Sequence, residues 1–171
     1  MPELPDVTVY VEHIRALLTG HVIEGTRLGS PFLVRSFEPP LSAVKGKKVL
    51  GARRLGKRIV FELEDELFLV LHLMIAGRLH FRDPGAKLAK KFGLLALDFA
   101  HGSLILTEAG SKRRASLYVV RGESALAQHD RGGLEPIGSS LADFDAALRR
   151  ENHTLKRALT DPTLFSGIGN A

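Results

Sequence analysis

The sequence contains no cysteine among its 171 residues. Neither disulfide bonds nor thiolate-bound zinc can therefore stabilise the fold of this chain. Its seven histidines are scattered and lack the close pairing of a metal site. We accordingly predict no metal ion and no cofactor for this chain.

Long apolar runs are also missing from the sequence. No stretch approaches the roughly 20 apolar residues that a membrane-spanning helix needs, and the N-terminus lacks the basic-then-apolar profile of a signal peptide. The length allows one domain with a sizeable core, or one domain and part of a second. We expect a globular cytoplasmic protein with no membrane partner.

Positive charge is in modest excess, with 24 lysines and arginines against 19 aspartates and glutamates and a net charge of +5. This excess is compatible with a phosphate-bearing partner. It does not require one, because many basic proteins never bind nucleic acid. The charge alone leaves the class of partner open.

The first predicted element is a helix close to the N-terminus. Apolar residues recur at three- and four-residue steps from Pro5 to Leu18, which indicates one buried helix face. Pro5 suits the first turn of a helix, and the negative charge of Asp6 is stabilised by the positive end of the helix dipole. Gly20 is a residue at which the helix can end.

Short β-rich runs separated by turn residues follow, from residue 21 to about residue 120. Residues 64–66 and 101–102 are typical of tight antiparallel connections. About eight runs with both faces partly apolar favour a two-sheet antiparallel sandwich with the first helix packed along it. The predicted strands are 21–28, 31–37, 47–55, 57–63, 67–74, 77–83, 92–99 and 103–109.

Helical signals return beyond the predicted strands. Apolar spacing predicts one helix over residues 141–148, capped by Ser139 or Ser140, and a shorter one over residues 155–159. The fold class is therefore α+β. The predicted domains are a β-sandwich over residues 1–125 and a partial all-α region over residues 126–171.

The chain closes on the residues LFSGIGNA. Gly167 and Gly169 permit backbone turns that bulkier residues resist, and Asn170 is a preferred residue for starting a helix. A helix start reached through glycines attracts phosphate through its unpaired N–H groups and its dipole. The alternative is an ordinary surface turn.

The N-terminal residues MPELPDV offer a possible nucleophile. If Met1 is removed, Pro2 exposes a secondary α-amine whose reference pKa is about two units below that of a lysine side chain, so it can attack an aldehyde-like carbon. Glu3 could then act as a general acid or base on the same substrate. The alternative is a chemically idle tail before a proline-initiated helix.

Two internal stretches suit a nucleic-acid partner. Lys57 lies among arginines between two predicted strands, a concentration of cations suited to phosphates, although a solvated hairpin explains it equally well. His72, Met74 and Ile75 precede a turn of small residues and could present an apolar wedge to stacked bases. Such apolar residues more often belong to a core.

Together these pieces resemble the formamidopyrimidine-DNA glycosylase and endonuclease VIII family of base-excision repair enzymes. The resemblance covers the whole chain, with the motifs in the order and at about the spacing of the family. The matching stretches are PELPDV, RRLGKRIV, HLMIAGRL, SKRRAS and LFSGIGNA.

The resemblance implies a DNA glycosylase with abasic-site lyase activity. It implies three catalytic residues: Pro2 attacks C1′ of a damaged nucleotide to leave a Schiff base, Glu3 helps to open the sugar ring, and Lys57 holds a backbone phosphate near the lesion. It also implies that Asn170 binds phosphate. The damaged nucleotide is extruded from the duplex before it is cut out. The expected further DNA contacts are His72, Met74, Ile75, Arg113, Arg114 and Lys156.

The same resemblance implies a partner and a location. The expected partner is double-stranded DNA that contains an oxidised base or an abasic site. We expect a monomer that works in the bacterial cytoplasm, at the nucleoid.

The sequence also departs from the family pattern. Asp6 stands where many members have glutamate, Met74 occupies a glycine position beside Ile75, and Ala115 replaces a phenylalanine after Arg113 and Arg114. The rest of the helix-two-turn-helix module and the family zinc finger do not follow residue 171, so we expect a truncation or a fragment. Losing their phosphate contacts should weaken DNA binding.

Two other functions remain open from the sequence. One is a catalytically silent remnant that binds DNA weakly. The other is a small-molecule tautomerase with an N-terminal proline base, but that class is built from short repeated β-α-β units and no repeat is visible here.

Overall fold

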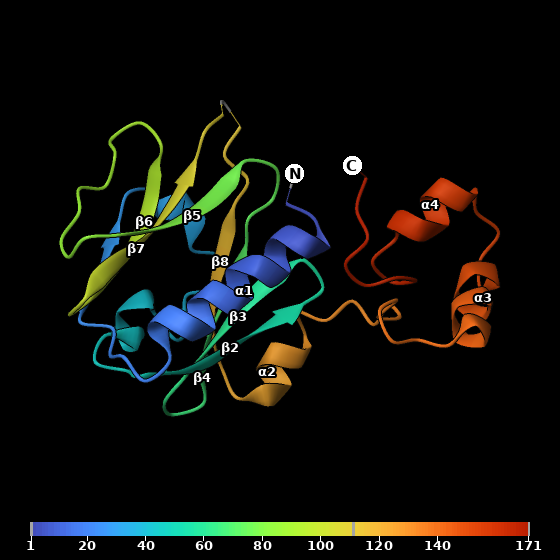
Figure 1. The fold of residues 1–171 in the computed structure, drawn as a ribbon, viewed down its shortest axis with the longest axis horizontal. Coiled ribbons are helices and arrows are strands. Elements are labelled where there is room, and N and C mark those ends of the chain that lie inside the picture. Colours follow the sequence, from blue (N-terminus) through green and yellow to red (C-terminus); the bar gives the residue numbers. More distant parts are fainter. Residues whose placement is uncertain (1, 111, 171) are drawn as a thin grey trace.

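The computed structural model describes residues 2–110 and 112–170. The expectations about removal of Met1 and about a truncation after Ala171 concern residues outside this part. One long helix, α1, precedes two β-sheets, and shorter helices follow them (Figure 1). None of the described helices is long and apolar enough to cross a bilayer.

Helix α1 spans Leu4–Leu18 and confirms the predicted N-terminal helix, starting one residue earlier. Pro5 lies in its first turn, where the missing N–H costs no helical hydrogen bond. The helix buries one face, made of Val7, Val11, Ile14 and Leu18, against the sandwich.

The strands form two four-stranded antiparallel sheets, which confirms the predicted sandwich (Figure 1). The first sheet has the order β1 (Gly25–Leu28), β6 (Gly93–Phe99), β7 (Gly102–Glu108) and β5 (Gly77–Arg82). The second has the order β2 (Val49–Leu55), β3 (Arg58–Leu63), β4 (Leu67–His72) and β8 (Ser116–Arg121). Every pairing is between neighbours of opposite direction.

The two predicted tight connections are present. Strands β3 and β4 are joined through Asp65 and Glu66, which both adopt left-handed backbone conformations with φ near +60° and +55°. Strands β6 and β7 are joined through residues 100–101. Two consecutive left-handed residues match the twist of a hairpin, which explains why the short β3–β4 connection suffices.

One predicted strand is wrong and another was missed. Residues 31–33 form a 3-10 helix (Pro31–Leu33), because Pro31 lacks an N–H for a strand ladder and its fixed φ suits a helical turn. The eighth strand is β8, whose Leu117 and Val119 face the core. A second 3-10 helix (Leu41–Val44) lies before β2.

Three short helices follow the sheets: α2 (Glu123–Ala127), α3 (Leu141–Arg149) and α4 (Leu155–Thr160). The last two confirm the predicted helices. Ser140 caps α3 by accepting a hydrogen bond from the Asp143 N–H at 3.1 Å. Helix α2 crosses the predicted boundary between residues 125 and 126, and the division into two domains stays a prediction.

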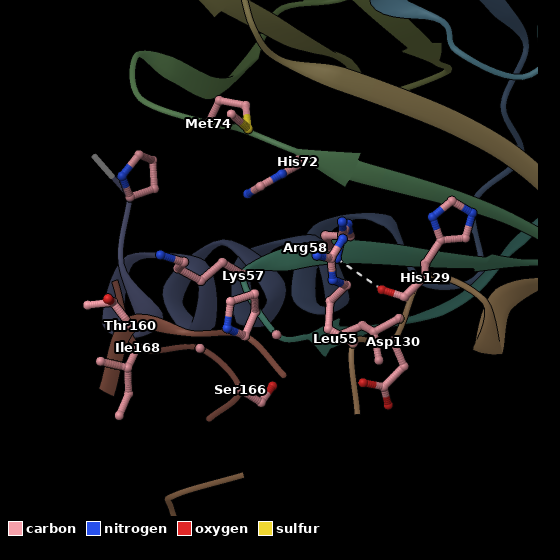
Figure 2. Close-up of a pocket in the computed structure, with 15 residues that line it drawn as sticks. Leu55, Lys57, Arg58, His72, Met74, His129, Asp130, Thr160, Ser166 and Ile168 are labelled. Atoms are coloured by element: carbon pink, nitrogen blue, oxygen red, sulfur yellow. Dashed lines mark hydrogen bonds between the residues drawn. The ribbon is translucent and has the colours of Figure 1, made fainter. Parts of the chain in front are cut away.

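Helices α3 and α4 lie to one side of the sandwich, and the segment after α4 returns to it (Figure 1). Leu134 and Phe165 form a parallel β-bridge, and the chain then passes beside the start of α1 and the β2–β3 hairpin. A pocket opens where these segments meet (Figure 2). This arrangement places the two ends of the described chain at one site.

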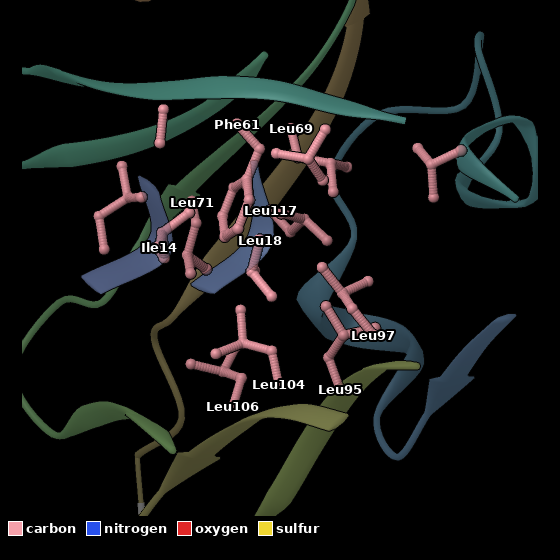
Figure 3. Close-up of a cluster of buried hydrophobic side chains, with 14 of the residues drawn as sticks. Ile14, Leu18, Phe61, Leu69, Leu71, Leu95, Leu97, Leu104, Leu106 and Leu117 are labelled. Carbon is pink, nitrogen blue, oxygen red and sulfur yellow. The ribbon is translucent and has the colours of Figure 1, made fainter. Parts of the chain in front are cut away.

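The main core lies between the two sheets and α1 (Figure 3). Phe61 and Leu69 of the second sheet face Leu97 and Leu104 of the first, and Leu18 of α1 closes the same cluster. Close packing of the buried leucines of both sheets fixes the position of the β2–β3 hairpin. That hairpin carries Lys57.

Candidate active site

A pocket of about 310 Å³ lies between the sandwich and the segment after α4 (Figure 2). Four segments distant in sequence form its walls: the N-terminus, the β2–β3 hairpin, the end of β4 and residues 160–168. Pro2, Lys57, His72 and Met74 all line it. The structure therefore brings together predicted site residues from the first 75 positions of the chain.

The first turn of α1 orients Pro2 and Glu3. The Glu3 backbone N–H donates a hydrogen bond to Asp6 Oδ2 at 2.8 Å, which satisfies a group that the helix leaves free. The Asp6 carboxylate therefore caps the N-terminus of α1. Pro2 is buried and forms part of the pocket wall.

Glu3 faces Lys57 across the base of the hairpin. Lys57 Nζ lies 3.6 Å from Glu3 Oε2, and both side chains are about four-fifths buried. The second oxygen, Glu3 Oε1, is buried without a hydrogen-bond partner. A buried polar atom of this kind is normally satisfied by water or by a bound molecule, so Glu3 is available to a ligand.

Gly169 and Gly167 allow the SGIGN loop to approach these residues. A side chain at Gly169 would overlap both the Glu3 carboxylate and the Lys57 ammonium group. Gly167 has φ of +85°, and a side chain there would overlap Leu4. Glycine is required at both positions because the backbone passes so close to the N-terminus.

His72 lies at the end of β4, directly opposite Arg58 on β3. Burial, with the positive charges of Arg58 and Lys57, lowers the pKa of His72 to about 4. The imidazole is therefore neutral at pH 7. A neutral histidine can both donate and accept a hydrogen bond in the pocket.

The structure separates the two residues proposed as an apolar wedge. Met74 lines the pocket and has a left-handed backbone with φ of +55°, which is uncommon for a residue with a side chain. Ile75 does not line the pocket and is 53% exposed. The turn thus points one apolar side chain into the site and the other into solvent.

A second, open cleft of about 460 Å³ lies beside the pocket and shares Lys57 with it. Lys156 and Asn170, both predicted DNA contacts, line this cleft together with Arg157 and Gly169. Three cationic side chains therefore surround one concave surface next to Glu3. Such a surface is suited to the negative charge of phosphates.

Arg113 and Arg114 lie elsewhere, in the connection between β7 and β8, and line neither cavity. The buried Glu108 carboxylate accepts hydrogen bonds from the backbone N–H groups of Arg114 at 3.0 Å and of Ala115 at 3.2 Å. Arg113 donates to the carbonyl of Lys91. Glu108 therefore fixes the backbone of this arginine pair.

Sequence reasoning missed the residues that join the two walls of the pocket. Arg54 Nη2 lies 2.7 Å from Glu135 Oε2, and Arg54 Nη1 donates to the Gly56 carbonyl at 3.0 Å. Arg58 Nη1 donates to the carbonyl of His129 at 2.9 Å. The cation run around Lys57 was a signal for Arg54 and Arg58, but nothing in the sequence singles out Glu135.

No three histidine, aspartate or glutamate side chains in residues 2–110 and 112–170 are arranged to hold a metal ion. The expectation that this chain needs no cofactor stays a prediction.

Comparisons with known proteins agree on one family. A sequence model of the formamidopyrimidine-DNA glycosylase N-terminal domain matches residues 1–115. The formamidopyrimidine-DNA glycosylase of Heliobacterium modesticaldum is 30% identical over 177 residues, which cover 99% of this chain and 64% of the relative. The formamidopyrimidine-DNA glycosylase of Acidovorax ebreus is 35% identical over 176 residues, which cover 99% of this chain and 63% of that relative.

Solved structures give the same result. The Lactococcus lactis enzyme bound to DNA with an abasic site superimposes with a TM-score of 0.85 at 26% identity, covering 99% of this chain and 66% of that one. MutM in complex with DNA containing carbocyclic 8-oxo-G gives a TM-score of 0.86, also at 26% identity. The chain spans just under two thirds of the length of the curated relatives. On the domain match, the sandwich fold and the N-terminal pocket together, this chain belongs to the formamidopyrimidine-DNA glycosylase family.

Proposed function

We propose that this chain is the catalytic part of a DNA glycosylase with abasic-site lyase activity, acting on duplex DNA that contains an oxidised base or an abasic site. The observation that carries the proposal is the pocket in which Pro2 lies beside Lys57, with the Glu3 carboxylate against Lys57 and Gly169. The relatives named above are bacterial, and we place the activity in the bacterial cytoplasm.

Pro2 acts as the nucleophile once Met1 has been removed. The lone pair of its α-amine forms a bond to C1′ of the extruded nucleotide, and the glycosidic bond breaks with its electron pair passing to the base, which takes up a proton. Because proline is a secondary amine, opening of the sugar ring leaves a cationic iminium. The low reference pKa of an α-amine keeps part of it unprotonated near pH 7.

Glu3 serves as the acid and base of the sequence. Its carboxylate takes up the proton that the Pro2 nitrogen loses after bonding to C1′ and delivers it to O4′ as the C1′–O4′ bond breaks, and its buried Oε1 has no protein hydrogen-bond partner. The Glu3 carboxylate then accepts a proton from C2′, and the electron pair left behind expels the 3′ phosphate and cuts the strand. Lys57, 3.6 Å from Glu3, remains a cation beside the departing negative charge.

The cleft lined by Lys57, Lys156 and Asn170 holds the DNA backbone next to the damaged nucleotide. Charge-assisted hydrogen bonds from lysines fix the strand without reading its sequence. The pocket, at about 310 Å³, lies at the lower end of the range of small-molecule sites and receives the extruded nucleotide.

Borohydride reduction in the presence of duplex DNA with an abasic site tests this function. The 171-residue chain, with Met1 removed, should form a covalent protein–DNA adduct and should nick the damaged strand. A variant with one extra residue retained before Pro2 is the matched control, since its proline nitrogen is an amide and cannot attack C1′. This control should bind the same DNA and form no adduct.

Salt-sensitive binding without adduct or nicking by the processed chain would contradict the proposal and favour a catalytically silent DNA-binding remnant. Turnover of a keto-enol substrate with no action on DNA would instead favour the tautomerase function.

A further inference from the structure

Arg58 is a pocket residue with no role in the function proposed above. It opens β3 directly after Lys57, which lies in the turn between β2 and β3, and both residues line the pocket. Lys57 extends toward Glu3 and the open cleft. Arg58 lies instead between His72 and His129 inside the pocket (Figure 2).

Part of the Arg58 guanidinium group makes no hydrogen bond within the described chain. Nη1 donates to the His129 carbonyl at 2.9 Å, which fixes the orientation of the group. Nε is buried and has no hydrogen-bond partner. In the described part of the chain no carboxylate lies within ion-pair distance of Arg58.

Charges of both signs lie near Arg58, but burial has the largest effect on it. Burial and, after it, the like charge of Arg131 lower the pKa of Arg58, and Tyr118 and Asp130 only partly offset this effect. Asp130 also lines the pocket, but its Oδ1 accepts a hydrogen bond from the Gly132 N–H at 2.9 Å. A partly desolvated cation with no carboxylate at ion-pair distance is unfavourable unless a ligand supplies a closer negative charge.

We propose that Arg58 binds a backbone phosphate of the damaged DNA strand at the end of the pocket away from Pro2. The inference rests on the proposed function and adds a contact to it. A guanidinium group offers paired N–H donors that match phosphate oxygens. Because Lys57, Arg58 and Arg131 outnumber the one carboxylate among the described residues that line this pocket, Asp130, a full negative charge fits better than a neutral base carbonyl.

The hairpin thus carries two adjacent phosphate contacts. Lys57 holds the strand in the open cleft, and Arg58 holds it inside the pocket. His72, opposite Arg58 in the strand register and neutral at pH 7, adds a hydrogen-bond donor without further charge.

The salt dependence of DNA binding tests this contact. The probe is a duplex with a tetrahydrofuran abasic analogue, which has no base, so any contact to a base carbonyl is absent. Each lost phosphate contact lowers the slope of log affinity against log salt by about 0.9, so the affinity ratio between ~50 and ~200 mM salt should shrink about threefold in Arg58→Gln. Arg58→Met, which keeps the apolar stem, should behave likewise.

Two control variants separate this role from others. Arg58→Lys retains a cation and should retain the slope of the unmodified chain. Arg121→Gln is a matched control, because exposed Arg121 also donates through Nη1 to one backbone carbonyl, that of Asp65 at 2.8 Å, but lies outside the pocket. Its slope should be unchanged, and thermal unfolding verifies that every variant is folded.

The outcomes are distinguishable from failure of the proposed function. Unchanged slopes in Arg58→Gln and Arg58→Met, with normal salt-dependent binding by the unmodified chain, would overturn the Arg58 contact alone. A loss seen only with duplexes that contain an oxidised base would assign Arg58 to base recognition and also overturn it. Absence of salt-dependent binding by the unmodified chain would overturn the proposed function and the contact that rests on it.

Discussion

The β-sandwich and the helical region after α2 are stabilised to different extents by apolar contacts. The sandwich and α1 share one continuous cluster of 25 buried hydrophobic residues, whereas the helical region has a separate cluster of three, Ala158, Leu164 and Phe165. Leu141 and Leu155 in that region are 84% and 62% exposed. The sandwich can therefore be stable by itself, and the helical region depends on its contacts with the sandwich.

The two regions also contribute different things to the site. The sandwich supplies the reactive side chains, since Glu3 is fixed by the first turn of α1 and Lys57 by the β2–β3 hairpin. The helical region supplies backbone, through Gly167 and Gly169. The reactive side chains therefore lie on the sandwich, the more stable region. Access of the DNA to them and phosphate binding depend on the less stable helical region.

The largest expected effect is on the core of the helical region. Phe165 is fully buried and its ring lies 4.6 Å from that of Phe144, so Phe165→Ala should cost about 3–5 kcal/mol and unfold this region first. Leu69→Ala in the main core should instead lower the unfolding transition of the sandwich. Hydrogen exchange of the two regions distinguishes them. If each variant lost hydrogen-exchange protection equally in the sandwich and in the helical region, the two regions would unfold together.

A pH effect of similar size is expected at His72. The pKa of His72 is about 4 in the folded chain and 6.5 in the unfolded chain. As the pH falls through 6.5, the unfolded chain therefore gains a proton at His72 and the folded chain does not. Stability should therefore fall between about pH 6.5 and pH 4, by on the order of 3 kcal/mol in total.

Urea unfolding at several pH values measures this effect, and His72→Gln should flatten the curve. The pKa of His129 is also lowered, by burial and by Arg58, so a smaller slope of the same sign should remain. An equally steep curve in His72→Gln would assign the acid sensitivity to other groups.

A smaller effect, confined to activity, is expected at the glycine that touches both reactive side chains. Gly169→Ala should displace the loop from Glu3 and Lys57 and slow adduct formation about a hundredfold, which is ~2.7 kcal/mol, with little change in the unfolding of the sandwich. Gly25→Ala, where an added methyl group meets nothing within 4 Å, is the matched control. Equal rates for the two variants would mean that the loop does not need this close approach.

The smallest effect is expected at the ion pair that joins the two regions. Arg54 is 19% exposed and Glu135 is 41% exposed, so solvent screens the pair in part. Glu135→Gln should destabilise the helical region by about 1–2 kcal/mol, because it leaves the Arg54 cation partly buried without its counter-charge. A double-mutant cycle with Arg54→Gln measures the coupling, and a coupling near zero would contradict a role in joining the regions.

Local patterns predicted most of the fold. The spacing of apolar residues predicted α1 and α3, and turn residues predicted the hairpin through Asp65 and Glu66. The strand predicted over residues 31–37 is wrong because its aromatic residues do not pack into a sheet, and Phe32 and Phe37 are 79% and 92% exposed. Strand β8 was overlooked because its pairing with β4 depends on a partner about 50 residues away in sequence.

The site was predicted only where residues form a contiguous motif. Pro2, Glu3 and Asn170 were identified through the family resemblance, and the structure places Pro2 and Asn170 in adjoining cavities with Glu3 between them. Glu135 and the unsatisfied Nε of Arg58 could not be predicted. Their contacts join segments more than 70 residues apart and follow from the tertiary fold alone.

Peptide mapping of the borohydride-reduced adduct tests the central claim, that Pro2 is the nucleophile. After digestion of both the protein and the DNA, mass spectrometry should find the residual sugar on the N-terminal peptide, attached at the nitrogen of Pro2. A sugar attached to Lys57 or to another lysine, with an unmodified Pro2, would contradict the account.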